Sequence, residues 1–164
     1  MIVRRIAMVV FAALATFTLS AQNQPQLPFP DLAGGLKATP GCLGVETART
    51  ASGKMVIFAW FEDKKAVLRW YNSEMHQQVM RMTGPPDPNH VPLAGIADDS
   101  GPILAVASLT LADAAASKNL PLPVSQIAIE LYQPLPGGVF IGGRFAPSTV
   151  KVPGLRDFTS TPGK

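Results

Sequence analysis

The sequence predicts a single α+β domain with an antiparallel sheet and one main helix, and three observations support this. Two β-favouring runs, residues 42–50 and 55–61, are separated by a short segment that contains Gly53, which is typical of a hairpin. Residues 64–82 follow without proline or glycine, and their apolar residues recur at spacings of three and four. The total of 164 residues fits one domain with its own core.

The later part of the chain predicts the remaining strands. Residues 103–111 form one candidate strand, and residues 124–133 and 139–145 are expected to form a closing hairpin around Pro134–Gly138. Residues 83–102 contain five prolines and no periodicity, which predicts a long loop. The Pro- and Gly-rich residues 22–41 predict an extended lead-in with at most one helical turn.

Capping residues mark the main helix. Asp63 is a suitable N-cap, and Asn72 with Ser73 could interrupt the helix, Ser73 then capping a second short piece. Burial alone would produce the observed apolar spacing, so Met75 and Met82 are interpreted as core residues.

The first 21 residues have the pattern of a secretory signal peptide. Arg4 and Arg5 precede the uncharged apolar residues 6–19, and the small residues Ser20 and Ala21 follow. Fourteen residues are short for a membrane span, which needs ~20. We therefore expect a secreted or periplasmic protein with no membrane attachment after cleavage; the alternative is an uncleaved N-terminal anchor.

Charge and cysteine content exclude several classes of protein. Removing Arg4 and Arg5 from the 14 basic residues leaves 12 against 11 acidic ones, and no basic run exceeds Lys64-Lys65. A nucleic-acid partner is therefore not expected. The single Cys42 excludes a disulfide framework or a cysteine zinc cluster and is interpreted as a packing residue, with an intermolecular disulfide as the alternative. Neither a phosphate loop nor a dinucleotide fingerprint occurs, so no cofactor is expected.

Strand 55–61 is apolar on both faces. Met55, Ile57, Ala59 and Phe61 alternate with Val56, Phe58 and Trp60. The predicted helix can cover only one face. Either a second sheet packs on the other face, as in a dimer, or the sheet encloses an apolar pocket.

Residues 40–80 resemble a known family. Pro40-Gly41-Cys42-Leu43-Gly44, then Phe61-Glu62-Asp63, then Ser73-Glu74-Met75-His76 occur in the order seen in dimeric α+β barrels of the antibiotic biosynthesis monooxygenase type. The resemblance implies a ferredoxin-like sheet and a homodimer whose two sheets form a barrel. Some members oxidise aromatic polyketides without metal or flavin, and others degrade haem. Phe61 replaces the tryptophan that usually ends this strand, and the family's first strand has no counterpart before the lead-in.

The domain organisation expected from the sequence is a signal peptide at 1–21, a lead-in at 22–39, the barrel-like domain at 40–146 and a tail at 147–164. In function, we expect an exported monooxygenase-like protein that acts on or binds a small hydrophobic or aromatic molecule. If catalytic, it would need no cofactor. The alternative is a non-catalytic ligand-binding or dimeric module of the same fold in the cell envelope.

The candidate site residues come from the helix and the two-faced strand. His76 is the candidate catalytic acid or base, with capping of helix carbonyls as the alternative. Phe58, Trp60 and Trp70 are expected to line a ligand pocket; the alternative is that Ile57 and Phe61, on the other face of the strand, line it instead of Phe58 and Trp60. No metal site is expected, because His76 and His90 are the only histidines. His90 and the pair Asp98-Asp99 are interpreted as parts of a solvated loop and of a turn.

Overall fold

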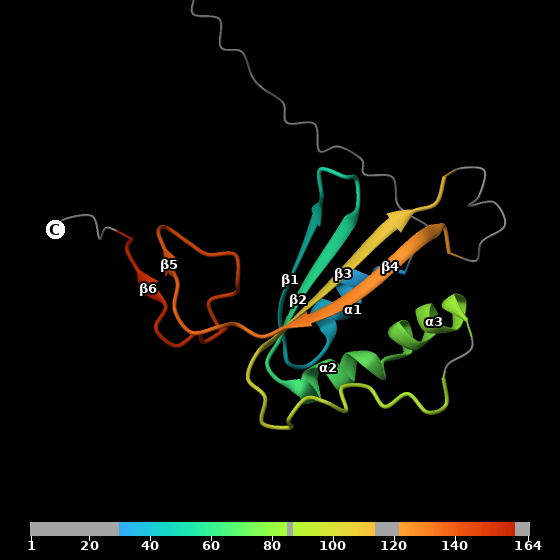
Figure 1. Cartoon of the computed structure of the whole chain (residues 1–164), viewed down its shortest axis with the longest axis horizontal. Coiled ribbons are helices and arrows are strands. Elements are labelled where there is room, and N and C mark those ends of the chain that lie inside the picture. The colour runs from blue at the N-terminus through green and yellow to red at the C-terminus, as the bar shows by residue number, and fades with distance from the viewer. Residues whose placement is uncertain (1–29, 85–86, 114–121, 160–164) are drawn as a thin grey trace, which may run out of the picture.

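The computed structural model describes residues 30–84, 87–113 and 122–159, which form an α+β fold (Figure 1). The predicted signal peptide and residues 22–29 of the lead-in lie outside these residues. One antiparallel sheet has the order β1-β2-β3-β4. Its strands are β1 (Cys42–Arg49), β2 (Met55–Phe61), β3 (Ile103–Leu111) and β4 (Val124–Tyr132). The helices are α1 (Leu32–Ala38), α2 (Lys64–Tyr71) and α3 (Glu74–Thr83). Two short strands, β5 (Val139–Phe140) and β6 (Arg156–Asp157), pair separately in parallel.

The predicted main helix is divided into α2 and α3, at the residues where the sequence allowed a break. The carboxylate of Asp63 accepts a hydrogen bond of 2.7 Å from the backbone N–H of Ala66 and so caps α2. Asn72 ends α2, and the hydroxyl of Ser73 accepts from the backbone N–H of His76 at 3.2 Å and caps α3. Each cap satisfies an N–H that has no partner within its helix.

Helix α1 was underestimated. The sequence predicted at most one turn, but seven residues are helical, which is about two turns. The carboxylate of Asp31 caps the helix by accepting from the N–H of Gly34, and Leu36 is buried in the core. Gly35 faces the side chains of Met75 and Trp70, and a Cβ at this position would collide with Met75. Glycine lowers the intrinsic helix propensity here, but it allows α1 to pack closely.

The hairpin of β1 and β2 is confirmed. Its register runs from Cys42 opposite Phe61 to Arg49 opposite Met55, with an irregularity between Cys42 and Gly44. At the turn, the backbone N–H of Thr50 donates to the carbonyl of Lys54 at 2.9 Å.

The predicted closing hairpin is wrong. Strand β4 pairs with β3, from Leu104 opposite Tyr132 to Leu111 opposite Val124, and not with residues 139–145. Gly137 and Gly138 both have positive φ and lie in the connection that leads from β4 to β5. In addition, β3 offers nine residues for pairing, whereas β5 has two.

The long loop determines the direction of β3. It runs back beside α3 and α2 toward the end of the sheet where α2 begins (Figure 1). As a result, β3 enters next to β2 and antiparallel to it, with Ile103 opposite Phe61.

The core lies between the helices and one face of the sheet, here called the inner face. It is built from Ile57, Ala59 and Phe61 of β2 together with residues of the neighbouring strands and of α1 and α2: Val45, Ile103, Leu109, Leu36, Ala66 and Val67. Phe61 and Ile103 are fully buried. This packing is the main source of stability that the fold offers, because it removes contiguous apolar area from water.

Residues 139–158, here called the C-terminal lobe, pack on the opposite, outer face of the sheet. The ring of Phe145 meets the ring of Phe58 edge-on, with centroids 5.0 Å apart, and that of Trp60 at 6.2 Å. Pro147 lies so close to Gly44 that a Cβ at Gly44 would collide with it. Val150 is fully buried, so the ordered lobe crosses the boundary predicted at residue 146.

Candidate functional site

The structure does not bring the predicted pocket residues into one place. Phe58 and Trp60 lie on the outer face of β2, beside Phe145. Trp70 lies on the inner side, where it packs against the core cluster and 5.6 Å from the ring of His76. The sheet therefore separates Trp70 and His76 from the other two side chains.

The C-terminal lobe buries Trp60 on the outer face and covers Phe58 only in part. Trp60 is only 7% exposed, and its Nε1 is buried with no hydrogen-bond partner. The C-terminal lobe therefore accounts for the burial of Trp60, whereas Phe58 keeps a partly exposed apolar surface.

His76 is buried at the junction of α2 and α3. Its Nδ1 lies 2.9 Å from the carbonyl oxygen of Tyr71, so Nδ1 carries the proton and donates to that carbonyl. Gln77 donates to the same oxygen at 2.7 Å. The ring also lies 4.9 Å from that of Tyr71, measured between centroids. These contacts are those of a side chain that caps the end of α2.

Burial lowers the pKa of His76, and the hydrogen bond to Tyr71 opposes that shift only in part. The imidazole is therefore neutral at physiological pH, with the proton on Nδ1 and a lone pair on Nε2. Such a group can accept a proton from a bound molecule. Val79, three residues further along α3, lines a cavity described below, whereas His76 is not one of its lining residues.

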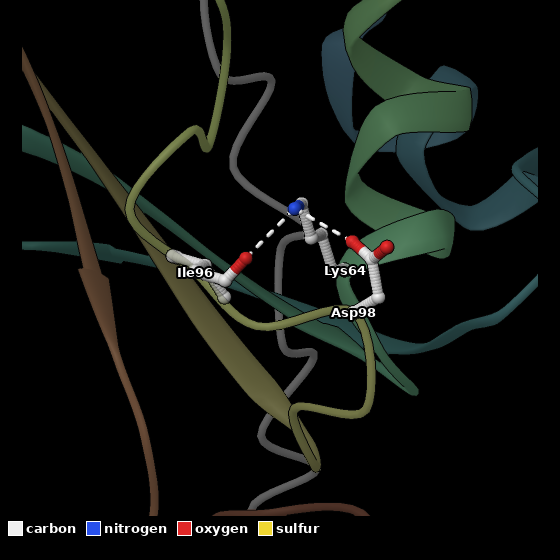
Figure 2. Close-up of polar contacts among 3 residues, drawn as sticks. All are labelled: Lys64, Ile96 and Asp98. Carbon is white, nitrogen blue, oxygen red and sulfur yellow. Dashed lines mark hydrogen bonds and ion pairs between the residues drawn. The ribbon is translucent and has the colours of Figure 1, made fainter.

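The long loop is fastened to the start of α2 by one lysine (Figure 2). The Lys64 ammonium donates to the carbonyl of Ile96 and to the carboxylate of Asp98, each at 2.7 Å. The hydrogen bond and the positive charge of Lys64 lower the pKa of Asp98. Asp98 and Asp99 form a turn, as predicted. His90 is exposed on the same loop, with its ring 6.1 Å from that of Tyr71.

An apolar cavity of about 280 Å³ opens on the inner face, at the end of the sheet where β4 begins. Its apolar walls come from α1, α3, the two strands and the residues just before β4: Leu32, Val79, Met82, Leu109, Leu122 and Ile127. The polar lining consists of Thr83, Ser125 and Gln126. We call this the inner cavity. None of the described lining residues is ionisable, so the cavity suits an uncharged molecule.

Sequence reasoning missed the inner cavity because its walls come from segments distant in the chain. Leu109 and Ile127 are opposite each other only in the β3–β4 register, and that pairing was assigned wrongly. One available signal was the alternation of Ile127, Ile129 and Leu131, which share a face and are all exposed.

Within residues 30–84, 87–113 and 122–159, no three His, Cys, Asp or Glu side chains are grouped so that they could hold a metal ion. The helices of the same ranges include none that is long and apolar enough to cross a membrane. Cys42 is a partly buried free thiol whose pKa is raised by burial.

The sheet and its helices define a ferredoxin-like α+β protein. Within this class, residues 16–82 match the family model described as antibiotic biosynthesis monooxygenase. The match includes residues 40–80 and confirms their resemblance to this family. The match begins inside the predicted signal peptide and ends within α3. No curated protein and no solved structure matches the chain.

Proposed function

We propose that the protein binds a small, uncharged hydrophobic or aromatic molecule in the inner cavity. The observation that carries this proposal is the cavity itself, bounded by apolar side chains of α1, α3, β3 and β4. An apolar cavity of about 150 Å³ is enough for benzene. A cavity of 280 Å³ suits a molecule with one to three aromatic rings.

A binding experiment tests this proposal. The fluorescent probe N-phenyl-1-naphthylamine is titrated into the protein, and we expect saturable binding. Ile127 is 44% exposed at the rim, so Ile127→Trp can fill the cavity without disturbing the core. It should weaken binding at least about tenfold, a loss of ~1.4 kcal/mol.

Leu131→Trp is the matched control, because Leu131 lies on the same face of β4, four residues away and outside this cavity. Its affinity for the probe should equal that of the wild type. Equal binding by wild type and Ile127→Trp would refute the proposed site.

A second candidate is a cofactor-independent monooxygenase that works on the same molecule. The observation that favours it is His76, a neutral imidazole next to the helix turn that lines the cavity. Incubation with an anthrone-type aromatic, followed by oxygen uptake, tests it. We expect His76→Gln to abolish uptake while probe binding persists; uptake unchanged by this substitution would leave binding as the sole function.

We further propose that the protein is exported and forms a homodimer. Export is supported by the pattern of residues 1–21. Dimerisation is supported by the exposed apolar row Ile127, Ile129 and Leu131 on an edge strand, which is costly to leave in water. Sedimentation at micromolar concentration should show a dimer, and the Ile129→Lys variant should be a monomer. Mass spectrometry of the exported protein should show that about 21 residues have been removed from its N-terminus.

A further inference from the structure

A second pocket, of about 430 Å³, lies at the opposite end of the same two strands. Its floor is Ile103 at the start of β3 and Leu131 near the end of β4, and its roof is the loop segment 95–100. We call it the loop pocket. Leu131 is four residues from Ile127 of the inner cavity, about 13 Å along an extended strand, so the two sites are distinct.

The roof of the loop pocket is held by several independent contacts. Leu93 and Ile96 pack against the core cluster. The backbone N–H of Ile96 donates to the carbonyl of Leu93 at 3.0 Å, and that of Ser100 donates to Ala97 at 3.1 Å. The Lys64 ammonium holds the carbonyl of Ile96 from the helix side (Figure 2). The pocket is therefore shaped before any ligand arrives, which lowers the entropic cost of binding.

One polar atom in this pocket lacks a partner. The hydroxyl oxygen of Ser100, a lining residue, is buried and makes no hydrogen bond with the protein. A buried hydroxyl left unpaired costs ~1–3 kcal/mol, and a ligand that pairs with it recovers this free energy. The rest of the lining combines apolar residues with two polar ones and, among the described residues, no Lys, Arg, His, Asp or Glu: Gly95, Ile96, Ala97, Ile103, Leu131, Tyr132 and Gln133.

We propose that the loop pocket is a second binding site, for a small uncharged molecule that has an apolar body and one hydrogen-bonding group directed at Ser100. The apolar body packs on Ile96 and Leu131. The polar group, such as a phenolic hydroxyl, pairs with the Ser100 hydroxyl once that side chain rotates toward the pocket, and this hydroxyl can donate or accept. This site differs from the inner cavity, where no lining atom is left unpaired among the described residues.

The test compares phenol with toluene, which have nearly the same shape but differ in the hydroxyl group. In ¹H–¹⁵N NMR titrations of the whole protein, phenol should shift the amides of residues 95–100, Ile103 and Leu131. Toluene should bind there at least about tenfold more weakly, because it leaves the Ser100 hydroxyl unpaired. In Ser100→Ala the two probes should bind equally.

Two substitutions in β4 show whether phenol binds in the loop pocket or in the inner cavity. Leu131→Trp should abolish the phenol shifts at residues 95–100, and Ile127→Trp should leave them intact. Equal affinities for phenol and toluene in the wild type, an unchanged ratio in Ser100→Ala, or shifts confined to the inner cavity would overturn the proposal. None of these results would affect N-phenyl-1-naphthylamine binding at the inner cavity, so the two proposals fail separately.

Discussion

His76 shows how one side chain can serve both the fold and a candidate reaction. Its Nδ1–H caps the carbonyl of Tyr71 at the end of α2, and its ring packs between Trp70 and Tyr71. The sequence offered both a helix-capping and a catalytic role, and the geometry shows the cap. The neutral Nε2 remains for the proposed chemistry.

Burial of His76 predicts a pH-dependent stability. Its folded pKa lies below the reference value of 6.5, so between these two values the unfolded chain binds a proton that the folded chain does not. The free energy of unfolding should therefore fall as the pH drops through about 6.5, and level off below the folded pKa. Urea denaturation across this range measures the decrease.

His76→Phe should remove most of this decrease, and Gln77 still satisfies the Tyr71 carbonyl in that variant. His90→Gln is the matched control, since His90 is exposed on the loop, and it should retain the decrease. The same pH dependence in His76→Phe as in the wild type would contradict the assignment.

At the scale of helices and strands, the elements that were predicted correctly are those whose limits depend on a few local residues. The β1–β2 hairpin and the caps Asp63 and Ser73 depend on local chemistry, and each was found where expected. Helix α1 was underestimated because Gly34 and Gly35 lower its propensity, whereas its packing against Met75 and Trp70 is a tertiary effect. The β4 partner was missed because strand pairing is decided across the whole sheet.

Lys64 is predicted to fasten the long loop. In Lys64→Met, the carbonyl of Ile96 and the carboxylate of Asp98 both lose their donor, so amides in residues 93–100 should exchange faster with deuterium. Global stability should change little, because the Asp98 end of the pair is exposed. Hydrogen exchange followed by mass spectrometry gives the measurement.

Lys65→Met serves as the control for this substitution, because the neighbouring Lys65 is exposed and makes neither contact. In the wild type, the folded pKa of Asp98 is below 3.8, so the ion pair should persist at neutral pH and be lost as the pH falls through that lowered pKa. Identical exchange in Lys64→Met and Lys65→Met would show that Lys64 does not hold the loop.

At the scale of the whole molecule, the C-terminal lobe is the feature that the sequence did not predict. It covers Trp60 and part of Phe58 and depends on the close approach of Pro147 to Gly44. The sequence indicated that both faces of β2 need a cover, but it could not identify the cover. Residues 139–158 contain few regular elements, and their packing becomes visible only in three dimensions.

Gly44→Ala is expected to loosen the lobe, because the added Cβ collides with Pro147. Trypsin should then cleave faster after Arg144 and Lys151, both in the lobe. Gly101→Ala is the matched control, since a Cβ there meets no atom within 4 Å. Equal cleavage rates in the two variants would mean that the Gly44–Pro147 contact does not hold the lobe on the sheet.

The central claim is that this ferredoxin-like α+β fold holds a small apolar molecule between its helices and the inner face of its sheet. Crystals of the protein grown with 1-bromonaphthalene test the claim most directly, because anomalous scattering locates the bromine atom. The account predicts a bromine peak inside the inner cavity, among Val79, Leu109 and Ile127. A peak only on the outer face beside Phe58, or no ordered bromine at saturating ligand, would contradict it.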